Sequence, residues 1–107
     1  MRQLPPAELK TWLDDAQREK PLLLDVREPW EFERCHIEGA KLMPMSQFQS
    51  TVSELDPDQE TVVICHHGVR SFHVARFLEH NGFENVINLT GGVDAWAKEV
   101  DRSMPTY

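Results

Sequence analysis

The sequence has few cysteines, no long apolar run and no excess of positive charge. Two cysteines among 107 residues are too few for a disulfide scaffold. The N-terminal residues lack the apolar segment of a signal peptide, and apolar runs such as residues 22–24 and 62–64 are far too short to cross a bilayer. We therefore expect a protein of the reducing cytoplasm without membrane association.

The charge balance is negative, with 11 basic and 18 acidic residues and a net charge of −7. This balance argues against nucleic acids and anionic membrane surfaces as partners, so an anionic substrate would need local positive charge. The chain is expected to form one domain over residues 1–107 that buries roughly two-thirds of its unfolded surface. It contains no internal repeat, linker or low-complexity segment.

Expected strands alternate with expected helices along the chain, which predicts a parallel sheet with right-handed crossovers. The uninterrupted apolar run at residues 22–24 favours a sheet that is covered on both faces. Apolar periodicity places strands at residues 2–4, 22–26, 40–43, 61–64 and 86–89, and helices at residues 7–17, 30–34, 47–55, 71–81 and 93–99. The tail, residues 101–107, is expected to be loosely ordered.

Cys65 stands where the apolar run at residues 61–64 gives way to a short loop and then to a helical pattern. In a parallel sheet, ligands bind at the carboxyl ends of strands. Loop N–H groups, a helix N-terminus and the guanidinium of Arg70 would all stabilise a thiolate there. The alternative is an inert, buried cysteine, but the polar loop that follows favours a reactive one. The sequence therefore predicts Cys65 as a nucleophile and Arg70 as an anion-stabilising residue.

The neighbours of Cys65 allow more than one interpretation. Gly68 permits a positive φ or a close backbone approach, and Ser71 suits a helix N-cap or a donor into the loop. Arg70 suits a structural salt bridge as well as an anion site. His66 and His67 suit either substrate contacts or solvent.

No metal or cofactor is expected. The five histidines and two cysteines show no CxxC or HxxxH spacing, and the adjacent imidazoles of His66 and His67 are expected to splay apart. Cys35 is interpreted as an incidental thiol, although a redox-resolving role stays open.

Residues 65–71, CHHGVRS, resemble the active-site loop of the rhodanese sulfurtransferases. Residues 23–28, 36–40 and 88–96 resemble the other signatures of that family, in the same order. The chain is most similar to the single-domain bacterial rhodaneses. This resemblance implies an α/β fold in which helices flank a five-stranded parallel sheet on both faces.

The resemblance also implies a reaction. The Cys65 thiolate would attack the sulfane sulfur of a donor such as thiosulfate, and the resulting persulfide would pass its outer sulfur to cyanide or a cellular thiol. A thioredoxin-like or sulfur-relay protein is a plausible partner, and no cofactor is needed. Substrate contacts would come from His66, His67, Gly68, Val69 and Ser71. Structural support for the site would come from Asp25, Arg27, Gly91 and Gly92.

Two rival functions fit the sequence less well. Cysteine-loop phosphatases and arsenate reductases use a Cys-x5-Arg loop, whereas Cys65 and Arg70 form the shorter Cys-x4-Arg. A tighter ring suits a persulfide sulfur better than a tetrahedral oxyanion. A non-catalytic binding module would commonly lose the cysteine, which is present here. Two departures from the family pattern are Cys35, where a glycine is frequent, and His66, where some thiosulfate-using relatives carry a cation.

Overall fold

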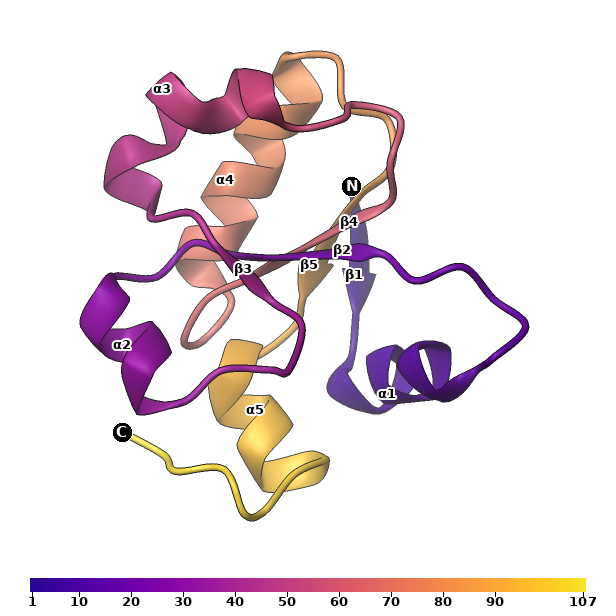
Figure 1. Cartoon of the computed structure of the whole chain (residues 1–107), viewed down its shortest axis with the longest axis vertical. Helices are drawn as coiled ribbons and strands as arrows, with labels where there is room; N and C mark the ends of the chain where they lie inside the picture. Colours follow the sequence, from indigo (N-terminus) through magenta and orange to yellow (C-terminus); the bar gives the residue numbers. More distant parts are fainter.

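Five parallel strands form one sheet in the order β1-β5-β4-β2-β3 (Figure 1). The computed structural model describes all 107 residues. The strands are β1 (Arg2–Leu4), β2 (Leu22–Asp25), β3 (Lys41–Leu42), β4 (Thr61–Ile64) and β5 (Val86–Leu89). Because β4 is central, its carboxyl end is flanked by the ends of β2 and β5. The α/β fold expected from the sequence is confirmed.

Helices cover both faces of this sheet (Figure 1). On one face lie α1 (Pro6–Asp14) and α5 (Gly92–Glu99), and on the other lie α3 (Phe48–Thr51) and α4 (Val69–His80). The short helix α2 (Pro29–Arg34) connects β2 to β3, and two 3₁₀ turns, η1 (Met45–Gln47) and η2 (Val52–Glu54), flank α3. None of the helices is both long and apolar enough to cross a membrane.

Side chains of β4 alternate between two separate hydrophobic cores. Val62 and Ile64 pack in the core with α1 and α5, whereas Val63 packs in the core with α4. All three are fully buried, because a strand covered on both faces has no solvent-facing side. Cys65 continues the alternation and faces the α4 core. The period of the strand thus decides which face of the sheet receives the sulfur.

The expected helix at residues 47–55 is instead broken into η1, α3 and η2. Hydroxyl groups explain the break: Ser50 Oγ donates to the Gln47 carbonyl at 2.8 Å, and Thr51 Oγ1 donates to the same carbonyl at 3.1 Å. Such side-chain bonds compete with the regular backbone ladder and bend a helix. Phe48 and Leu55 are the only buried residues in this stretch, so it is anchored near its two ends.

Three other boundaries differ from expectation by a few residues. Helix α1 ends at Asp14 rather than at residue 17, and the edge strand β3 keeps only two residues. Helix α4 begins at Val69, two residues before the expected start. The earlier start places the helix N-terminus directly after the Cys65 loop.

The tail is held in place rather than loosely ordered. The Tyr107 hydroxyl donates to Glu31 Oε2 at 2.8 Å and accepts from Arg27 Nη1 at 2.8 Å. The Tyr107 ring also stacks on His66, with ring centroids 3.9 Å apart. These contacts join the tail to the carboxyl-end edge of the sheet.

Candidate functional site

Cys65 lies directly after β4 at the centre of a tight loop, with 1% of its surface exposed. The Gly68 N–H donates to the sulfur at 3.0 Å, and the thiol donates to Ser71 Oγ at 3.3 Å. The N-terminus of α4 follows at Val69, so its free N–H groups and positive dipole end adjoin the loop. This environment suits an anionic sulfur.

Two glycines make the loop possible. Gly68 caps α4 with φ +95°, and a Cβ there would come within 3.1 Å of the Gly91 nitrogen. Gly92 has φ +60°, and a Cβ there would lie 2.2 Å from the Cys65 carbonyl oxygen. The start of α5 can therefore press against the loop, where the Val93 N–H donates to the Cys65 carbonyl at 2.9 Å.

Ser71 lies within α4 and is buried, so it is not the N-cap that its position suggested. Its hydroxyl donates to Asn88 Oδ1. The Asn88 amide is oriented by its own donations, to Gln3 Oε1 at 2.9 Å and to the Gly68 carbonyl at 3.3 Å. With its proton directed at Asn88, the Ser71 hydroxyl presents a lone pair to the Cys65 thiol. When the thiol ionises, the same hydroxyl can turn and donate to the sulfur.

Arg70 forms a two-pronged salt bridge with the buried Glu31. Nη1 and Nη2 of Arg70 donate to Oε1 and Oε2 of Glu31 at 2.8 and 2.9 Å. These two hydrogen bonds lower the pKa of the Glu31 carboxyl to about 2 and raise the pKa of the Arg70 guanidinium. Of the two roles considered for Arg70, the structure therefore displays the salt bridge. The Arg70 side chain is 37% exposed, so solvent still reaches part of it.

Asp25 and Arg27 form a second, fully buried ion pair with an Nη2–Oδ2 distance of 2.7 Å. Arg27 also donates to the Cys35 carbonyl at 2.7 Å and to the Tyr107 hydroxyl. The two ion pairs are linked because the same hydroxyl donates to Glu31. Burial raises the pKa of Tyr107 to about 12, so this bridging phenol stays neutral at physiological pH. The Asp25–Arg27 pair is thus connected to Arg70 by hydrogen bonds that run through Tyr107 and Glu31.

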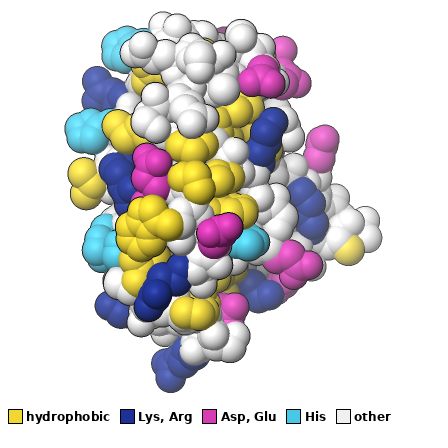
Figure 2. All heavy atoms as spheres, turned by 60° about the vertical axis from the view of Figure 1, so that its left-hand side comes forward, with side chains coloured by type: hydrophobic (Ala, Val, Ile, Leu, Met, Phe, Trp, Pro, Cys, Tyr) yellow, Lys and Arg dark blue, Asp and Glu magenta, His cyan; other side chains and the backbone are white.

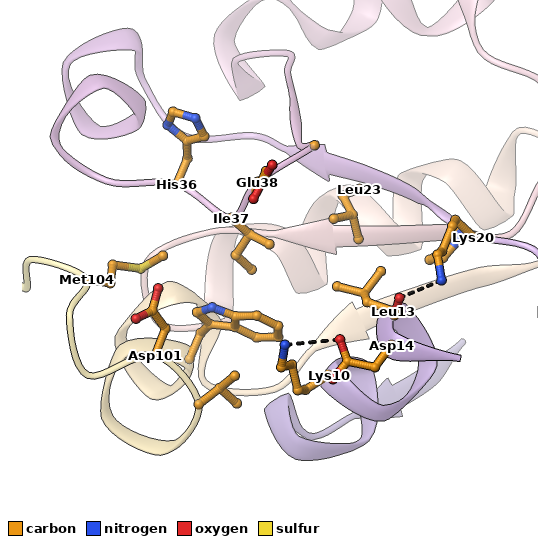
Figure 3. A pocket seen from close by; sticks show the side chains of 14 residues that line it. Lys10, Leu13, Asp14, Lys20, Leu23, His36, Ile37, Glu38, Asp101 and Met104 are labelled. Atoms are coloured by element: carbon orange, nitrogen blue, oxygen red, sulfur yellow. Dashed lines mark hydrogen bonds and ion pairs between the residues drawn. The ribbon is translucent and has the colours of Figure 1, made fainter. Parts of the chain in front are cut away.

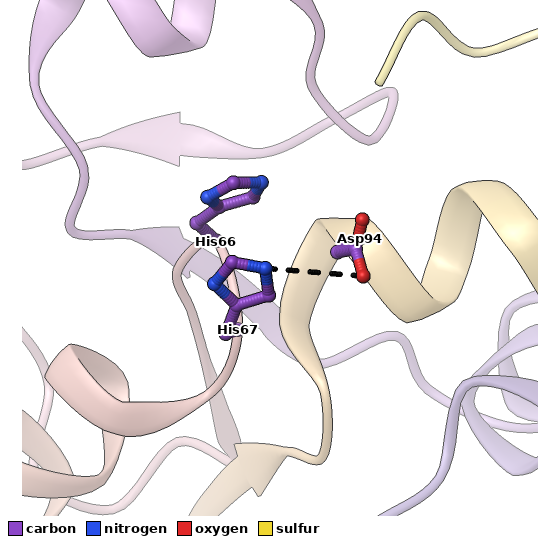
Figure 4. A group of neighbouring side chains, drawn as sticks. All are labelled: His66, His67 and Asp94. Atoms are coloured by element: carbon purple, nitrogen blue, oxygen red, sulfur yellow. Dashed lines mark ion pairs between the residues drawn. The ribbon is translucent and has the colours of Figure 1, made fainter. Parts of the chain in front are cut away.

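The side chains of His66 and His67 were expected to splay apart, but they lie side by side. Their ring centroids lie 3.9 Å apart with an interplanar angle of 32°, and Figure 4 shows both rings on the side of the loop that faces Asp94. Nε2 of His67 lies 3.9 Å from Asp94 Oδ2. Nε2 of His66 is buried without a hydrogen-bond partner, and burial lowers the pKa of this imidazole.

The surroundings of the loop carry exposed apolar side chains, including Val69 at 65% and Trp30 at 62% exposure. On the face shown in Figure 2, apolar side chains lie close to acidic, basic and histidine side chains. A hollow of about 390 Å³ opens beside the loop and is lined by His67, Gly68, Val69 and Asn88 among others. Cys65 itself does not line this hollow, which borders the loop on the side of Gly68 and Val69.

A larger cleft, of about 810 Å³, lies away from Cys65 between α1, α5 and residues 36–39 (Figure 3). Its floor is apolar, with Leu23 and Trp96, and Lys10 lies on its rim. No residue of the Cys65 loop lines it. The cleft is therefore separate from the candidate site.

Cys35 packs in the core with α1 and α5, whereas Cys65 packs in the core with α4. Both thiols are free. Since the sheet separates the two cores, the structure gives no support to Cys35 as a resolving partner for Cys65.

Sequence reasoning missed four residues of this site: Glu31, Asn88, Asp94 and Tyr107. Asn88 left a signal, because it is a polar residue in the otherwise apolar strand β5. Glu31 left a weaker one as the N3 residue of a capping box whose N-cap is Glu28. Asp94 left only its place in the family-like stretch 88–96, and Tyr107 left no signal, since the roles of both come from contacts with distant segments.

Comparison with known proteins places these features in a family. The rhodanese-like domain family matches residues 5–99. The chain is 42% identical over 100 residues to the rhodanese-like/PpiC domain-containing protein 12 of Arabidopsis thaliana, covering 90% of this chain and 32% of that protein. It is 36% identical over 83 residues to a protein of Allochromatium vinosum named sulfurtransferase, covering 78% of each. The structure of a rhodanese-like domain protein from Staphylococcus aureus superposes with a TM-score of 0.85 at 29% identity, covering 100% of this chain and 99% of that one.

Proposed function

This chain belongs to the rhodanese-like family, with Cys65 at the position of the family's active-site cysteine, and we propose that it is a sulfurtransferase. In this proposal Cys65 carries a sulfane sulfur as a persulfide. The observation that supports it most directly is the sulfur cradle, in which the Gly68 N–H donates to Sγ at 3.0 Å beside the N-terminus of α4. A relative of similar length is named sulfurtransferase.

The first half-reaction loads the cysteine. The Cys65 thiol gives up its proton to solvent, and the thiolate attacks the outer sulfur of a sulfane donor such as thiosulfate. The new bond joins Sγ to that sulfur, the sulfur–sulfur bond of the donor breaks, and sulfite leaves with the bonding electron pair. Ser71 assists by turning its hydroxyl from Asn88 to the thiolate.

The second half-reaction removes the sulfur from Cys65. An acceptor thiolate attacks the outer sulfur of the persulfide, takes that sulfur, and leaves Cys65 as a thiolate. No external oxidant or reductant is needed, because the sulfane sulfur keeps its oxidation level. The acceptor in this proposal is a small thiol or a cysteine of a thioredoxin-like or sulfur-relay protein. Exposed Val69 and Trp30 near the loop would give a protein acceptor an apolar contact.

Arg70 would act through the exposed part of its side chain. Its charge is shared with Glu31, so we assign it two tasks, which are to fix the loop and to attract an anionic donor over a short range. Local attraction matters because the net charge of −7 opposes an anion at long range.

Intact mass spectrometry tests the proposal. The protein is incubated with thiosulfate or with glutathione persulfide, and we expect a mass increase of one sulfur atom that cyanide removes. Cys65→Ser should take up no sulfur, whereas the matched variant Cys35→Ser should load like the wild type. If no sulfane donor produces an adduct on Cys65, the sulfurtransferase proposal is wrong.

A further inference from the structure

Three potential metal ligands meet at the mouth of the Cys65 loop. His66 and His67 each offer an imidazole nitrogen and Asp94 offers a carboxylate oxygen, and these three atoms lie within 4.8 Å of one another (Figure 4). We propose that they bind a divalent transition-metal ion such as Zn²⁺, and that the bound ion inhibits sulfur transfer. The inhibition, though not the binding, rests on the proposed function.

The donor set has the chemistry of a zinc site. Imidazole nitrogen and carboxylate oxygen are common Zn²⁺ ligands, and three protein ligands leave one position open. Ligands about 2.0–2.1 Å from a tetrahedral ion lie about 3.4 Å apart. The widest gap in the cluster therefore has to close by no more than about 1.4 Å, and the gap of 3.9 Å between His67 Nε2 and Asp94 Oδ2 by only about 0.5 Å.

An independent observation concerns His66. Its Nε2 atom is buried and has no hydrogen-bond partner, although buried polar atoms are nearly always satisfied. The ring is held by stacking on Tyr107, at a centroid distance of 3.9 Å. A metal ion would give this nitrogen the partner that it lacks.

The backbone already holds the ligands in place. The Asp94 N–H donates to the His66 carbonyl at 3.0 Å, and the Val93 N–H donates to the Cys65 carbonyl at 2.9 Å. The loop and the start of α5 are thus joined at the point where the side chains meet. Asp94 also pairs with Lys98 at 3.0 Å, but the Lys98 side chain is 66% exposed and such pairs contribute little. His67, whose side chain is 62% exposed, gives an ion a route in from solvent.

Inhibition follows from the open coordination position. An acceptor thiol that approaches Cys65 is itself a strong Zn²⁺ ligand once deprotonated. An ion on His66 lies next to the reactive cysteine in the chain, so it would capture the acceptor or obstruct its approach. The proposed effect is reversible, since removal of the metal frees the loop.

Zn²⁺ binding is tested in a variant without cysteines, so that no thiol can bind the ion. The double variant Cys35→Ser/Cys65→Ser is titrated with Zn²⁺ by calorimetry, and we expect one ion per chain. Adding His67→Ala or Asp94→Asn should weaken binding at least about tenfold, in line with the loss of one ligand contact. The matched control, His73→Ala, removes an exposed histidine on α4 and should leave the affinity unchanged. No binding, or binding unaffected by His67→Ala and Asp94→Asn, would overturn the site.

Inhibition is tested in the chain that keeps both thiols. Zn²⁺ should slow sulfur transfer, a chelator should restore it, and the inhibitory concentration should rise at least about tenfold in Asp94→Asn. Equal inhibition of the wild type and Asp94→Asn would place the inhibitory ion on the thiol and refute the proposal. If Cys65 takes up no sulfur while the thiol-free variant still binds Zn²⁺, the metal site stands and only the sulfurtransferase function fails.

Discussion

Replacing Glu31 by glutamine should remove a pH-dependent part of the stability of this protein. Glutamine keeps the shape of the side chain but cannot carry the charge that pairs with Arg70. The carboxylate is well suited to the test, because only 5% of its side chain is exposed and solvent screens it little. The affected property is the free energy of unfolding.

The magnitude follows from the pKa of Glu31, which hydrogen bonds from Arg70 lower from 4.5 to about 2. Each pKa unit is worth about 1.4 kcal/mol, so the ionised carboxylate contributes about 3 kcal/mol at neutral pH. Because the folded pKa lies below the unfolded one, this contribution is present above pH 4.5 and is lost as the pH falls toward 2. About 2 kcal/mol of it should disappear between pH 7 and pH 3.

Urea unfolding at both pH values measures this loss. The difference in unfolding free energy between the wild type and Glu31→Gln should shrink by about 2 kcal/mol on going from pH 7 to pH 3. Other carboxyl groups titrate in both proteins and cancel in the difference. Glu33→Gln removes an exposed carboxylate from the same helix and controls for the loss of one charge. A difference that is independent of pH would refute the electrostatic account of the Arg70–Glu31 pair.

Two further substitutions test the loop. Gly92→Ala should cost at least about 2 kcal/mol in urea unfolding and abolish sulfur loading, because its Cβ would collide with the Cys65 carbonyl at 2.2 Å. Gly39→Ala, with a similar positive φ but open space around it, should cost only about 1 kcal/mol and leave loading intact, and equal costs would contradict the collision argument. Ser71→Ala should cost about 1–3 kcal/mol, because it leaves Asn88 Oδ1 buried without a donor, and should slow sulfur loading measured by intact mass. The exposed variant Ser46→Ala is its control, and an unchanged loading rate in Ser71→Ala would exclude the hydroxyl from the chemistry.

Local patterns in the sequence predicted the parts of the site that are local in the chain. Strands β4 and β5 are correct to the residue, because short β-branched runs bounded by polar loops leave little choice of register. The position of Cys65 at the end of a central strand followed from the same pattern. The family resemblance added the number of strands and the identity of the loop.

Contacts between distant residues could not be predicted in this way. Glu31 and Arg70 are 39 residues apart, and Glu31 and Tyr107 are 76 apart. Which side chains meet depends on how the crossovers bring separate strand ends together, and on side-chain directions that a shift of one residue reverses. Ser71 illustrates the second point, because the start of α4 at Val69 turns it from an expected N-cap into a buried partner of Asn88.

The order of the residues is enough to specify that a cysteine lies on a glycine-containing loop between a buried strand and a helix. It is enough because strand, turn and helix formation depend on neighbouring residues. The surroundings of that cysteine come from folding of the whole chain: the hydroxyl of Ser71 held by Asn88, the Arg70–Glu31 pair held by Tyr107, and two imidazoles close to Asp94. These contacts arise where the loops after β2, β4 and β5 and the chain tail converge on one edge of the sheet.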